Sequence, residues 1–359
     1  ALPNAMRLLI VTQKVDRNDP ILGFFHRWIV EFAKHADRIS VICLEQGEYN
    51  LSKNVSVYSL GKEHNADLRG LARGLARTKY ITRFYHHIWS LRNEYDVVFV
   101  HMNQEYVLLG GLLWKFLGKK VAMWRNHHFG NVFTRIAVVF CDKVFCTSKY
   151  SFTAQFKKTI LMPVGIDTNL FKRDESISRI PHSILFLGRI SPVKRPDILI
   201  DAVALLKKKN ILAEVRLYGD PALQDKKYFE LLKEKTSTLG LAKQVHFYPG
   251  IPNEKTPAIY NQYEVFINAS PSGMYDKTIF EAMACESLIL TSNLNLRGQV
   301  DDMFIFKESN AEDMAKKLQK IFELEKWEKK RYGEILKTYV HNKHSIDLLA
   351  EKFAKYFIL

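Results

Sequence analysis

Short runs of β-branched and aliphatic residues alternate with helix-period segments from one end of this chain to the other. The alternation is typical of parallel sheets with helices on both faces, because each crossover between parallel strands needs a helix-length connection. The turn-rich residues 162–174 separate two such series, which predicts two α/β domains of Rossmann-like type. The expected strands are 7–11, 39–44, 55–60, 97–101, 121–124 and 144–147, then 184–187, 214–218, 245–248, 265–267 and 288–291.

Apolar positions at three- and four-residue steps mark the helices between these strands. No repeat of 20–50 residues and no low-complexity tract interrupts the pattern. The expected helices are 24–36, 66–93, 105–117 and 151–157, then 196–208, 226–239, 255–262 and 277–285, with 309–326 and 328–358 closing the chain.

Composition narrows the class of protein. With 359 residues, 47% hydrophobic and 25% charged, the chain has the composition of a soluble globular protein, which excludes disorder, collagen and a disulfide scaffold. The four cysteines are scattered, so reduced thiols are expected. The longest apolar run, 106–114, is far shorter than the ~20 residues that cross a bilayer. We therefore expect a cytoplasmic protein that could touch a membrane from that side.

The net charge of +15 is concentrated in the first half, where residues 1–170 hold 23 basic and 13 acidic residues. Such a field favours an anionic partner, which could be nucleic acid, anionic lipid or a phosphorylated substrate. No nucleic-acid-binding signature is present, so nucleic acid is not expected. No His/Cys cluster or D-x-D motif has metal-ligand spacing, so neither a metal nor another cofactor is expected.

The segment LFLGRISPVK places two cations after a predicted strand. Arg189 follows Gly188 directly, and Lys194 comes five residues later. A planar guanidinium and a point-charge ammonium at the carboxyl end of a strand could bracket a diphosphate. By itself this spacing also fits solvated loop charges.

The segment SPSGMYDKTIFEAMACESLILTS contains a second candidate. A glycine-containing loop leads from a strand into a helix, whose N-terminus would direct N–H groups and a positive dipole end toward an anion. Glu281 lies about one turn inside that helix, where a carboxylate could accept both hydroxyls of a ribose. An ordinary surface glutamate is the alternative interpretation.

Together these segments resemble the GT-B glycosyltransferases, in particular the retaining enzymes of glycosyltransferase family 4. LMPVGIDTNLF is similar to the family's crossing segment, LFLGRISPVKRPDILIDAVALL to its G-R-x4-K strand and helix, and FEAMACESLILTSN to its E-A-M-A-x-G segment. The resemblance implies two Rossmann-like domains facing each other across a central cleft. The expected boundaries are an acceptor-binding domain at 1–165, a nucleotide-sugar-binding domain at 166–335, and a C-terminal helix at 336–359 that packs back on the first domain.

The resemblance also implies roles for individual residues. Arg189 and Lys194 would neutralise the diphosphate of a nucleotide-sugar as the glycosidic bond breaks, and Glu281 would bind the ribose. The reaction would retain anomeric configuration by a front-face displacement, without a metal. Backbone groups facing the donor would come from Met274, Tyr275, Asp276, Lys277 and Thr278, and from Gly23 after the first strand.

This chain departs from the family at three positions. The family's E-x7-E would place a carboxylate at Gly273, and Asp276 is the expected substitute for it. Glu286 stands where the family mostly has glycine, and Arg195 replaces the glycine that commonly follows the lysine.

Histidines follow two strands of the first domain. Family members place a histidine after the second of these strands, near donor sugar and acceptor, and a gapless alignment puts Arg125 at that position. We favour His127 or His128 instead, which leaves the register open. His101 ends the other strand, where a packing role is an equal alternative.

Residues 68–93 hold six basic residues and no acidic one on a helical pattern. A solvated face covering the first sheet is one interpretation. The other, which we favour, is a patch that meets anionic lipid or acceptor. Its expected members are Arg69, Arg73, Arg77, Lys79 and Arg83.

The leading hypothesis is a retaining hexosyltransferase that moves a sugar from a nucleoside diphosphate to a glycan or lipid-linked acceptor. It would act in polysaccharide or glycolipid synthesis at the cytoplasmic membrane face. Two alternatives are a sugar-nucleotide epimerase or phosphorylase of the same fold, and a catalytically silent lipid-surface or scaffold protein. The sequence names neither the nucleotide, the sugar, the acceptor nor the oligomeric state.

Overall fold

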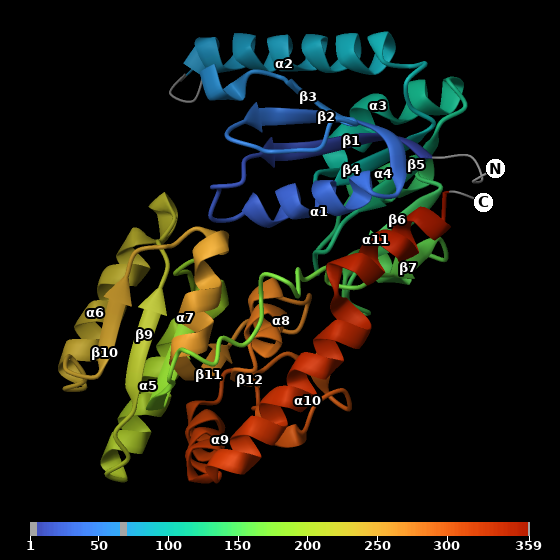
Figure 1. Ribbon diagram of the computed structural model, residues 1–359. Helices are drawn as coiled ribbons and strands as arrows, with labels where there is room; N and C mark the ends of the chain where they lie inside the picture. The colour runs from blue at the N-terminus through green and yellow to red at the C-terminus, as the bar shows by residue number, and fades with distance from the viewer. Residues whose placement is uncertain (1–5, 65–69, 358–359) are drawn as a thin grey trace. The chain divides into compact units, whose positions relative to one another are not determined.

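The computed structural model describes residues 6–64 and 70–357, and the chain divides into two units (Figure 1). The first comprises residues up to Gly165 together with the segment from Ile346 onward, and the second comprises Ile166–Ser345. The expected boundary at 335/336 lies inside helix α10 (Lys326–His344), which belongs to the second unit. The return to the first unit therefore begins ten residues later than expected.

The first unit is built on a parallel seven-stranded sheet of order β3-β2-β1-β4-β5-β6-β7. Alternate residues of its strand β1 enter different cores, with Leu8 and Ile10 on one face and Leu9 and Val11 on the other. Both faces are therefore covered, as in other parallel sheets. The strands are β1 (Met6–Val15), β2 (Ala36–Gln46), β3 (Val55–Ser59), β4 (Val97–His101), β5 (Lys120–Trp124), β6 (Lys143–Cys146) and β7 (Thr159–Leu161).

Helices of the first unit cover the two faces of this sheet separately. Residues of α1 and α11 join one core, and residues of α2, α3 and α4 join the other. None of the helices in the described ranges is both long and apolar enough to span a bilayer. The helices are α1 (Gly23–Ala33), α2 (Gly70–Ser90), α3 (Gln104–Phe116), α4 (Val132–Phe140) and α11 (Ile346–Lys355), with short 3-10 turns η1 (Lys62–His64) and η2 (Phe152–Gln155).

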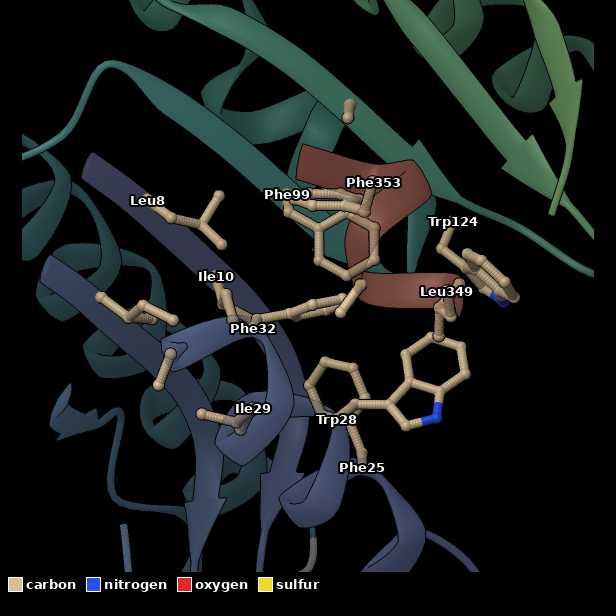
Figure 2. Close-up of a cluster of buried hydrophobic side chains, with 14 of the residues drawn as sticks. Leu8, Ile10, Phe25, Trp28, Ile29, Phe32, Phe99, Trp124, Leu349 and Phe353 are labelled. Atoms are coloured by element: carbon tan, nitrogen blue, oxygen red, sulfur yellow. The ribbon is translucent and has the colours of Figure 1, made fainter. Parts of the chain in front are cut away.

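Aromatic side chains attach α11 to the first unit (Figure 2). Phe353 stacks on Phe32 of α1 with ring centroids 4.8 Å apart and meets Phe99 of β4 edge-on at the same distance. Trp28 of α1 donates from Nε1 to the carbonyl of Gly165 at 3.0 Å, which fixes the end of this unit's main segment.

Four local expectations were wrong. The single helix at 328–358 is broken at Ser345, whose ψ of 156° is extended, and the helix at 151–157 is only the short turn η2. Both α4 and the edge strand β7 were missed.

The second unit contains a parallel five-stranded sheet of order β10-β9-β8-β11-β12. The central strand β8 pairs with β9 on one side and β11 on the other, so the segments after these strands emerge at one edge. The strands are β8 (Ile180–Leu187), β9 (Glu214–Tyr218), β10 (Val245–Tyr248), β11 (Tyr263–Asn268) and β12 (Leu288–Thr291). The helices are α5 (Pro196–Lys208), α6 (Lys226–Thr238), α7 (Thr256–Gln262), α8 (Lys277–Ala284), α9 (Ala311–Glu323) and α10, with 3-10 turns η3 (Pro192–Lys194), η4 (Leu223–Asp225), η5 (Asn253–Lys255), η6 (Leu294–Leu296) and η7 (Asp302–Phe304).

Truncation of Phe353 tests the role of α11 in the first unit. Phe353→Ala should lower the free energy of unfolding of that unit by about 3–5 kcal/mol, because it removes a buried ring and leaves a cavity against Phe32 and Phe99. Urea unfolding followed by tryptophan fluorescence measures this, since four of the five tryptophans lie in the first unit. The exposed Lys355→Ala is the control. A loss below about 1 kcal/mol would show that α11 contributes little to this core.

Candidate functional site

The candidate site lies in the second unit, where the segments after β8 and β11 emerge side by side. Leu185 of β8 is opposite Phe266 of β11 in the sheet. The segment between β8 and α5 carries Arg189 and Lys194, and the segment between β11 and α8 carries Gly273 to Asp276. Strand pairing thus brings together two motifs that are far apart in the sequence.

An ion pair joins the two segments. Nζ of Lys194 donates to both carboxylate oxygens of Asp276, at 2.6 and 2.7 Å. Asn268 Nδ2 and Ser270 Oγ each donate to the same carboxylate at 2.7 Å. The side chains of Lys194 and Asp276 are only 24% and 15% exposed, so solvent screens the pair weakly.

Asp276 is held in its charged form. Burial alone would raise the pKa of this carboxyl, but the Lys194 charge and the three hydrogen-bond donors outweigh burial and lower the pKa below its ordinary value. Asp276 occupies the N-cap position of α8, yet its side chain makes no capping hydrogen bond. The positive end of α8, with Lys277 and Thr278 in its first turn, therefore has no side-chain cap from Asp276.

Arg189 differs from Lys194 in its surroundings. Its side chain is exposed, and its guanidinium has no hydrogen-bond or ion-pair partner within the described part of the chain. The turn that carries it is tightly packed, because a Cβ on Gly219 would lie 1.9 Å from the carbonyl oxygen of Gly188. The backbone at this edge is therefore close-packed, while the Arg189 side chain is available to an anion.

Glu281 is buried, which contradicts the alternative interpretation of a surface glutamate. Its side chain is 2% exposed. Asn253 Nδ2 donates to Oε1 at 3.0 Å, and the Tyr260 hydroxyl donates to Oε2 at 2.9 Å. Burial and the Glu281 charge raise the pKa of Tyr260 well above its ordinary value, so the hydroxyl stays a donor. Neutral donors hold this carboxylate in place.

Polar residues after β12 form hydrogen bonds with the loop at 272–275, which was expected to face the donor. Asn293 donates to the carbonyl of Met274 at 2.7 Å, Tyr275 donates from its hydroxyl to the carbonyl of Asn295 at 3.1 Å, and Asn295 donates to Ser272 at 2.9 Å. Sequence reasoning missed these residues, although asparagines directly after a strand end were a usable signal. It also missed the supporting residues Asn253, Tyr260, Asn268 and Ser270.

Two departures from the family pattern lie in left-handed backbone. Arg195 has a φ of 52° and Glu286 a φ of 58°. Glycine adopts this conformation without steric cost, which explains why glycine suits both positions. Each side chain gains an ion pair instead, Arg195 with Asp197 and Glu286 with Lys337.

The candidate histidines lie in the first unit and have different surroundings. His101 is buried, stacks on Phe25 with centroids 3.7 Å apart, and has Nδ1 3.2 Å from the Thr12 hydroxyl. It therefore has the packing contacts of a core residue. His128 stacks on His127 at 5.0 Å.

His127 and Arg125 line a cavity of about 260 Å³ after β4 and β5. Nδ1 of His127 accepts from the backbone N–H of Phe129 at 3.0 Å, and burial with the nearby Arg125 charge lowers the His127 pKa. The imidazole is therefore neutral near pH 7. Arg125 donates from Nε to Gln104 at 3.0 Å, and burial lowers its pKa as well.

Gly23 opens α1, and its N–H donates to the carbonyl of Asp19 at 3.0 Å. A Cβ there would lie 2.8 Å from the Arg17 carbonyl, so close packing is enough to require glycine.

The basic patch is described only in part. Arg69 lies outside the described residues, as does the side chain of Arg73. Arg77 and Lys79 are exposed, whereas Arg83 donates to the carbonyl of Leu60 at 2.8 Å and so has a structural contact. Arg77 also borders a groove of about 410 Å³ beside α2, whose other lining residues include Tyr80, Phe84 and Tyr106.

The four cysteines are buried free thiols. Within the described ranges, His, Cys, Asp and Glu form no group of three or more that could hold a metal ion.

Comparison with known proteins agrees with this geometry. Residues 168–336 match the family model "Glycosyl transferases group 1". A segment of 113 residues is 28% identical to D-inositol 3-phosphate glycosyltransferase of Rhodococcus opacus, covering 31% of this chain and 25% of that protein. The enzyme of the same name from Geodermatophilus obscurus is 25% identical over 169 residues, covering 41% of this chain and 35% of that protein. The matched segments thus span about a third or less of these curated relatives.

Solved structures share the fold over nearly the whole chain. Anabaena Alr3699/HepE, crystallised in complex with UDP and glucose, superposes with a TM-score of 0.76 at 18% identity, covering 98% of this chain and 99% of that one. Sucrose-phosphate synthase from Thermosynechococcus elongatus gives a TM-score of 0.78 at 14% identity, covering 98% of both chains. The expected fold class, with two Rossmann-like α/β units of GT-B type, is confirmed.

A buried histidine beside the site makes stability depend on pH. His344 contacts Tyr275 and Phe280, its Nε2 lies 3.2 Å from the Tyr339 hydroxyl, and burial together with Lys343 lowers its pKa to about 4. An unfolded histidine binds a proton near pH 6.5, so this contribution is complete above that pH and declines as the pH falls toward 4.

We expect the second unit to lose about 2 kcal/mol of stability between pH 7.5 and pH 5 from this one group. His344→Gln, which cannot titrate, should flatten that part of the profile in chemical unfolding experiments. The exposed His341→Gln is the control. Equal slopes for wild type and His344→Gln would contradict the assignment.

Proposed function

We propose that this chain transfers a sugar from a nucleoside diphosphate sugar to an acceptor, and the match of residues 168–336 to the family model "Glycosyl transferases group 1" supports this proposal. The observation that carries the proposal is the arrangement at the edge of the second sheet. There the cations Arg189 and Lys194, the N-terminus of α8 and the buried carboxylate of Glu281 all belong to segments that follow β8 and β11.

The two cations and α8 would bind the diphosphate. A leaving diphosphate gains negative charge as the glycosidic bond breaks, so fixed positive groups stabilise the transition state more than the ground state. Arg189 contributes a guanidinium that has no partner among the described residues, and the first turn of α8 contributes N–H groups and the positive end of its dipole. These groups supply the charge stabilisation by themselves, and we therefore propose a reaction that needs no metal.

Glu281 would accept hydroxyls of the nucleotide ribose. Each of its oxygens already accepts one hydrogen bond, from Asn253 and Tyr260, and a carboxylate oxygen has capacity for a second. Both protein donors are neutral groups, from an amide and a phenol. Complexes of Alr3699/HepE with UDP and with UDP-glucose support a nucleotide-sugar donor.

Asp276 would replace the carboxylate that is missing at Gly273. It holds Lys194 in place by two hydrogen bonds and would accept a hydroxyl of the donor sugar with its remaining lone pairs. Lys194 has three N–H donors, so it can contact a phosphate oxygen without leaving Asp276. We propose that the reaction retains anomeric configuration and passes through a front-face displacement, in which the departing phosphate helps to deprotonate the acceptor.

In this proposal the acceptor binds to the first unit. The neutral His127 in its cavity would hydrogen-bond a sugar hydroxyl, and the groove beside α2 would receive a glycan or lipid-linked acceptor. The exposed Arg77 and Lys79 support the proposal that the protein acts at an anionic membrane surface, as in cell-surface polysaccharide or glycolipid synthesis.

Two observations favour a second candidate function. Lys194 is already neutralised by Asp276, and Gly273 carries no carboxylate, which suits a catalytically silent protein of this fold. Calorimetry with UDP, GDP and ADP separates the two, because a silent scaffold has no need to bind any of them. An epimerase or phosphorylase would bind a nucleotide or phosphate but would form no new glycoside.

Removing either cation should abolish transfer without unfolding the protein. We expect Arg189→Ala and Lys194→Ala to lower the initial rate at least 100-fold, since a lost donor to a developing oxyanion typically costs about 10²–10³. Donor-dependent thermal shifts should fall as well, because a ligand of the native state raises the melting temperature by mass action.

Lys233→Ala, which removes an exposed lysine of α6, is the control for loss of charge. Lys194→Ala leaves the largely buried Asp276 carboxylate without its cation, which by itself lowers stability. The double variant with Asp276→Asn removes that uncompensated charge, so a rate that stays low in the double variant reflects lost chemistry and not lost stability. More than a tenth of the wild-type rate in both single variants would count decisively against the proposal.

Asp276→Asn should separate nucleotide binding from sugar transfer. The amide keeps the shape and releases Lys194, so the affinity for UDP should stay within about threefold while kcat falls at least 100-fold through loss of the sugar contact. Calorimetry and initial rates measure the two effects. Asp201→Asn, which breaks the ion pair between Lys235 and Asp201 elsewhere in the same unit, is the matched control. An unchanged kcat would show that Asp276 has only a structural role.

A further inference from the structure

Helix α4 in the first unit turns an apolar face toward solvent. Val132, Ile136 and Val139 recur at steps of four and three residues, which places them on one side of the helix. They are 61%, 42% and 71% exposed. The opposite side, with Ala137 and Val138, is buried against the sheet.

The neighbouring helix α3 extends this surface. A Cβ on Gly111 of α3 would lie 2.8 Å from Phe140 of α4, so the two helices pack in direct contact. Phe133 lies two helical turns before Phe140 and therefore on the same side of α4, toward α3. We call the resulting surface the α3–α4 face and define it by Leu112 and Phe116 of α3 with Val132, Phe133, Ile136 and Val139 of α4, all of them exposed.

A surface of this kind is expected to bind a partner or a membrane. Single exposed apolar residues are ordinary on a soluble protein, but six exposed apolar side chains on two helices in contact are typical of an interaction site. Phe116 is 82% exposed and makes its ring available to a partner or a lipid. The core of the first unit does not need this side of either helix.

Charge identifies the occupant. Residues 102–158, which contain both helices, hold nine Lys and Arg but only two acidic residues, and one of these, Asp142, is paired with Lys115. Helix α4 contains no acidic residue, and its Arg135 is exposed. A second copy would bring the same positive charge to the contact and be repelled, whereas an anionic bilayer attracts it.

We propose that the α3–α4 face inserts its apolar side chains into the interfacial zone of an anionic phospholipid bilayer. The aliphatic and phenyl groups would enter the acyl boundary, and the exposed Arg135 of α4 would meet the headgroups. The inference rests on the membrane part of the proposed function and names the surface that carries it. Its basis is independent of both the donor site and the basic residues of α2.

A fluorescent label can locate the inserted surface. All four natural cysteines are buried, so an exposed engineered cysteine is labelled selectively. An environment-sensitive dye on Val139→Cys should shift to the blue when vesicles of phosphatidylcholine with phosphatidylglycerol are added. The same dye on Leu223→Cys, which is 82% exposed in the second unit, should not shift. Equal responses at both positions would overturn the placement of the membrane surface.

Vesicle co-sedimentation measures the energetic role of the face. We expect the wild-type chain to bind the anionic vesicles at least tenfold more tightly than phosphatidylcholine vesicles, and Val139→Glu and Phe116→Glu each to weaken binding at least tenfold. The neutral Val139→Gln should also weaken binding, which separates lost insertion from added repulsion. Leu223→Glu adds the same charge elsewhere and should bind as the wild type does.

Other outcomes overturn the proposal in distinguishable ways. A concentration-dependent dimer that Val139→Glu dissociates would assign the face to a second copy. Loss of vesicle binding on changing Arg77 and Lys79, with no effect of Val139→Glu, would assign docking to α2. The variants of the α3–α4 face lie outside the second unit, so UDP should still raise their melting temperature. If UDP fails to stabilise even the wild type, the transferase proposal fails, whatever the vesicles show.

Discussion

The parallel pairing of β8 with β11 is the constraint on which the candidate site depends. Because Leu185 lies opposite Phe266, the segments that follow the two strands leave the sheet at the same edge. Lys194 can therefore reach Asp276, which is 82 residues away along the chain. That ion pair engages the side chain at the N-cap of α8, so the helix begins without a cap from Asp276. A single strand pairing thus determines both the local charge and the surroundings of the α8 N-terminus.

The charged groups at this edge differ in how far they are neutralised. Asp276 has a cation and two neutral donors, whereas Glu281 has two neutral donors and remains buried as a carboxylate partner for a ligand. Arg189 is exposed and has no ion-pair partner in the described residues. A buried charge without partners is costly, and an exposed cation is not. An anion that binds here would therefore pair with the exposed guanidinium of Arg189, and it would share the Lys194 ammonium with Asp276.

The first unit is organised around an aromatic core and not around charged groups. Its aromatic core around Trp28 and Phe353 needs α11, which returns from the far end of the chain (Figure 2). Its opposite face is covered by helices whose outward sides carry both basic and aromatic residues on α2 and exposed apolar residues on α3 and α4. Because the apolar side chains on α3 and α4 face water, the unit retains a surface whose burial would lower its free energy. The donor chemistry and the membrane contact that we propose thus belong to separate parts of the chain.

The sequence by itself determined every strand except the edge strand β7, most of the helices and the division near residue 165, because buried parallel strands appear as continuous apolar runs and covering helices as a regular period. It missed α4, since a helix whose exposed side is apolar lacks the polar half of the amphipathic pattern. It also missed the break at Ser345, where no glycine or proline marks the end of α10. Arg189, Lys194 and Glu281 could be selected from local motifs, but the burial of Glu281 and the partner of Lys194 could not. Those depend on the register between β8 and β11 and on how α7 packs against α8, and contacts between distant segments are decided only when the tertiary structure forms.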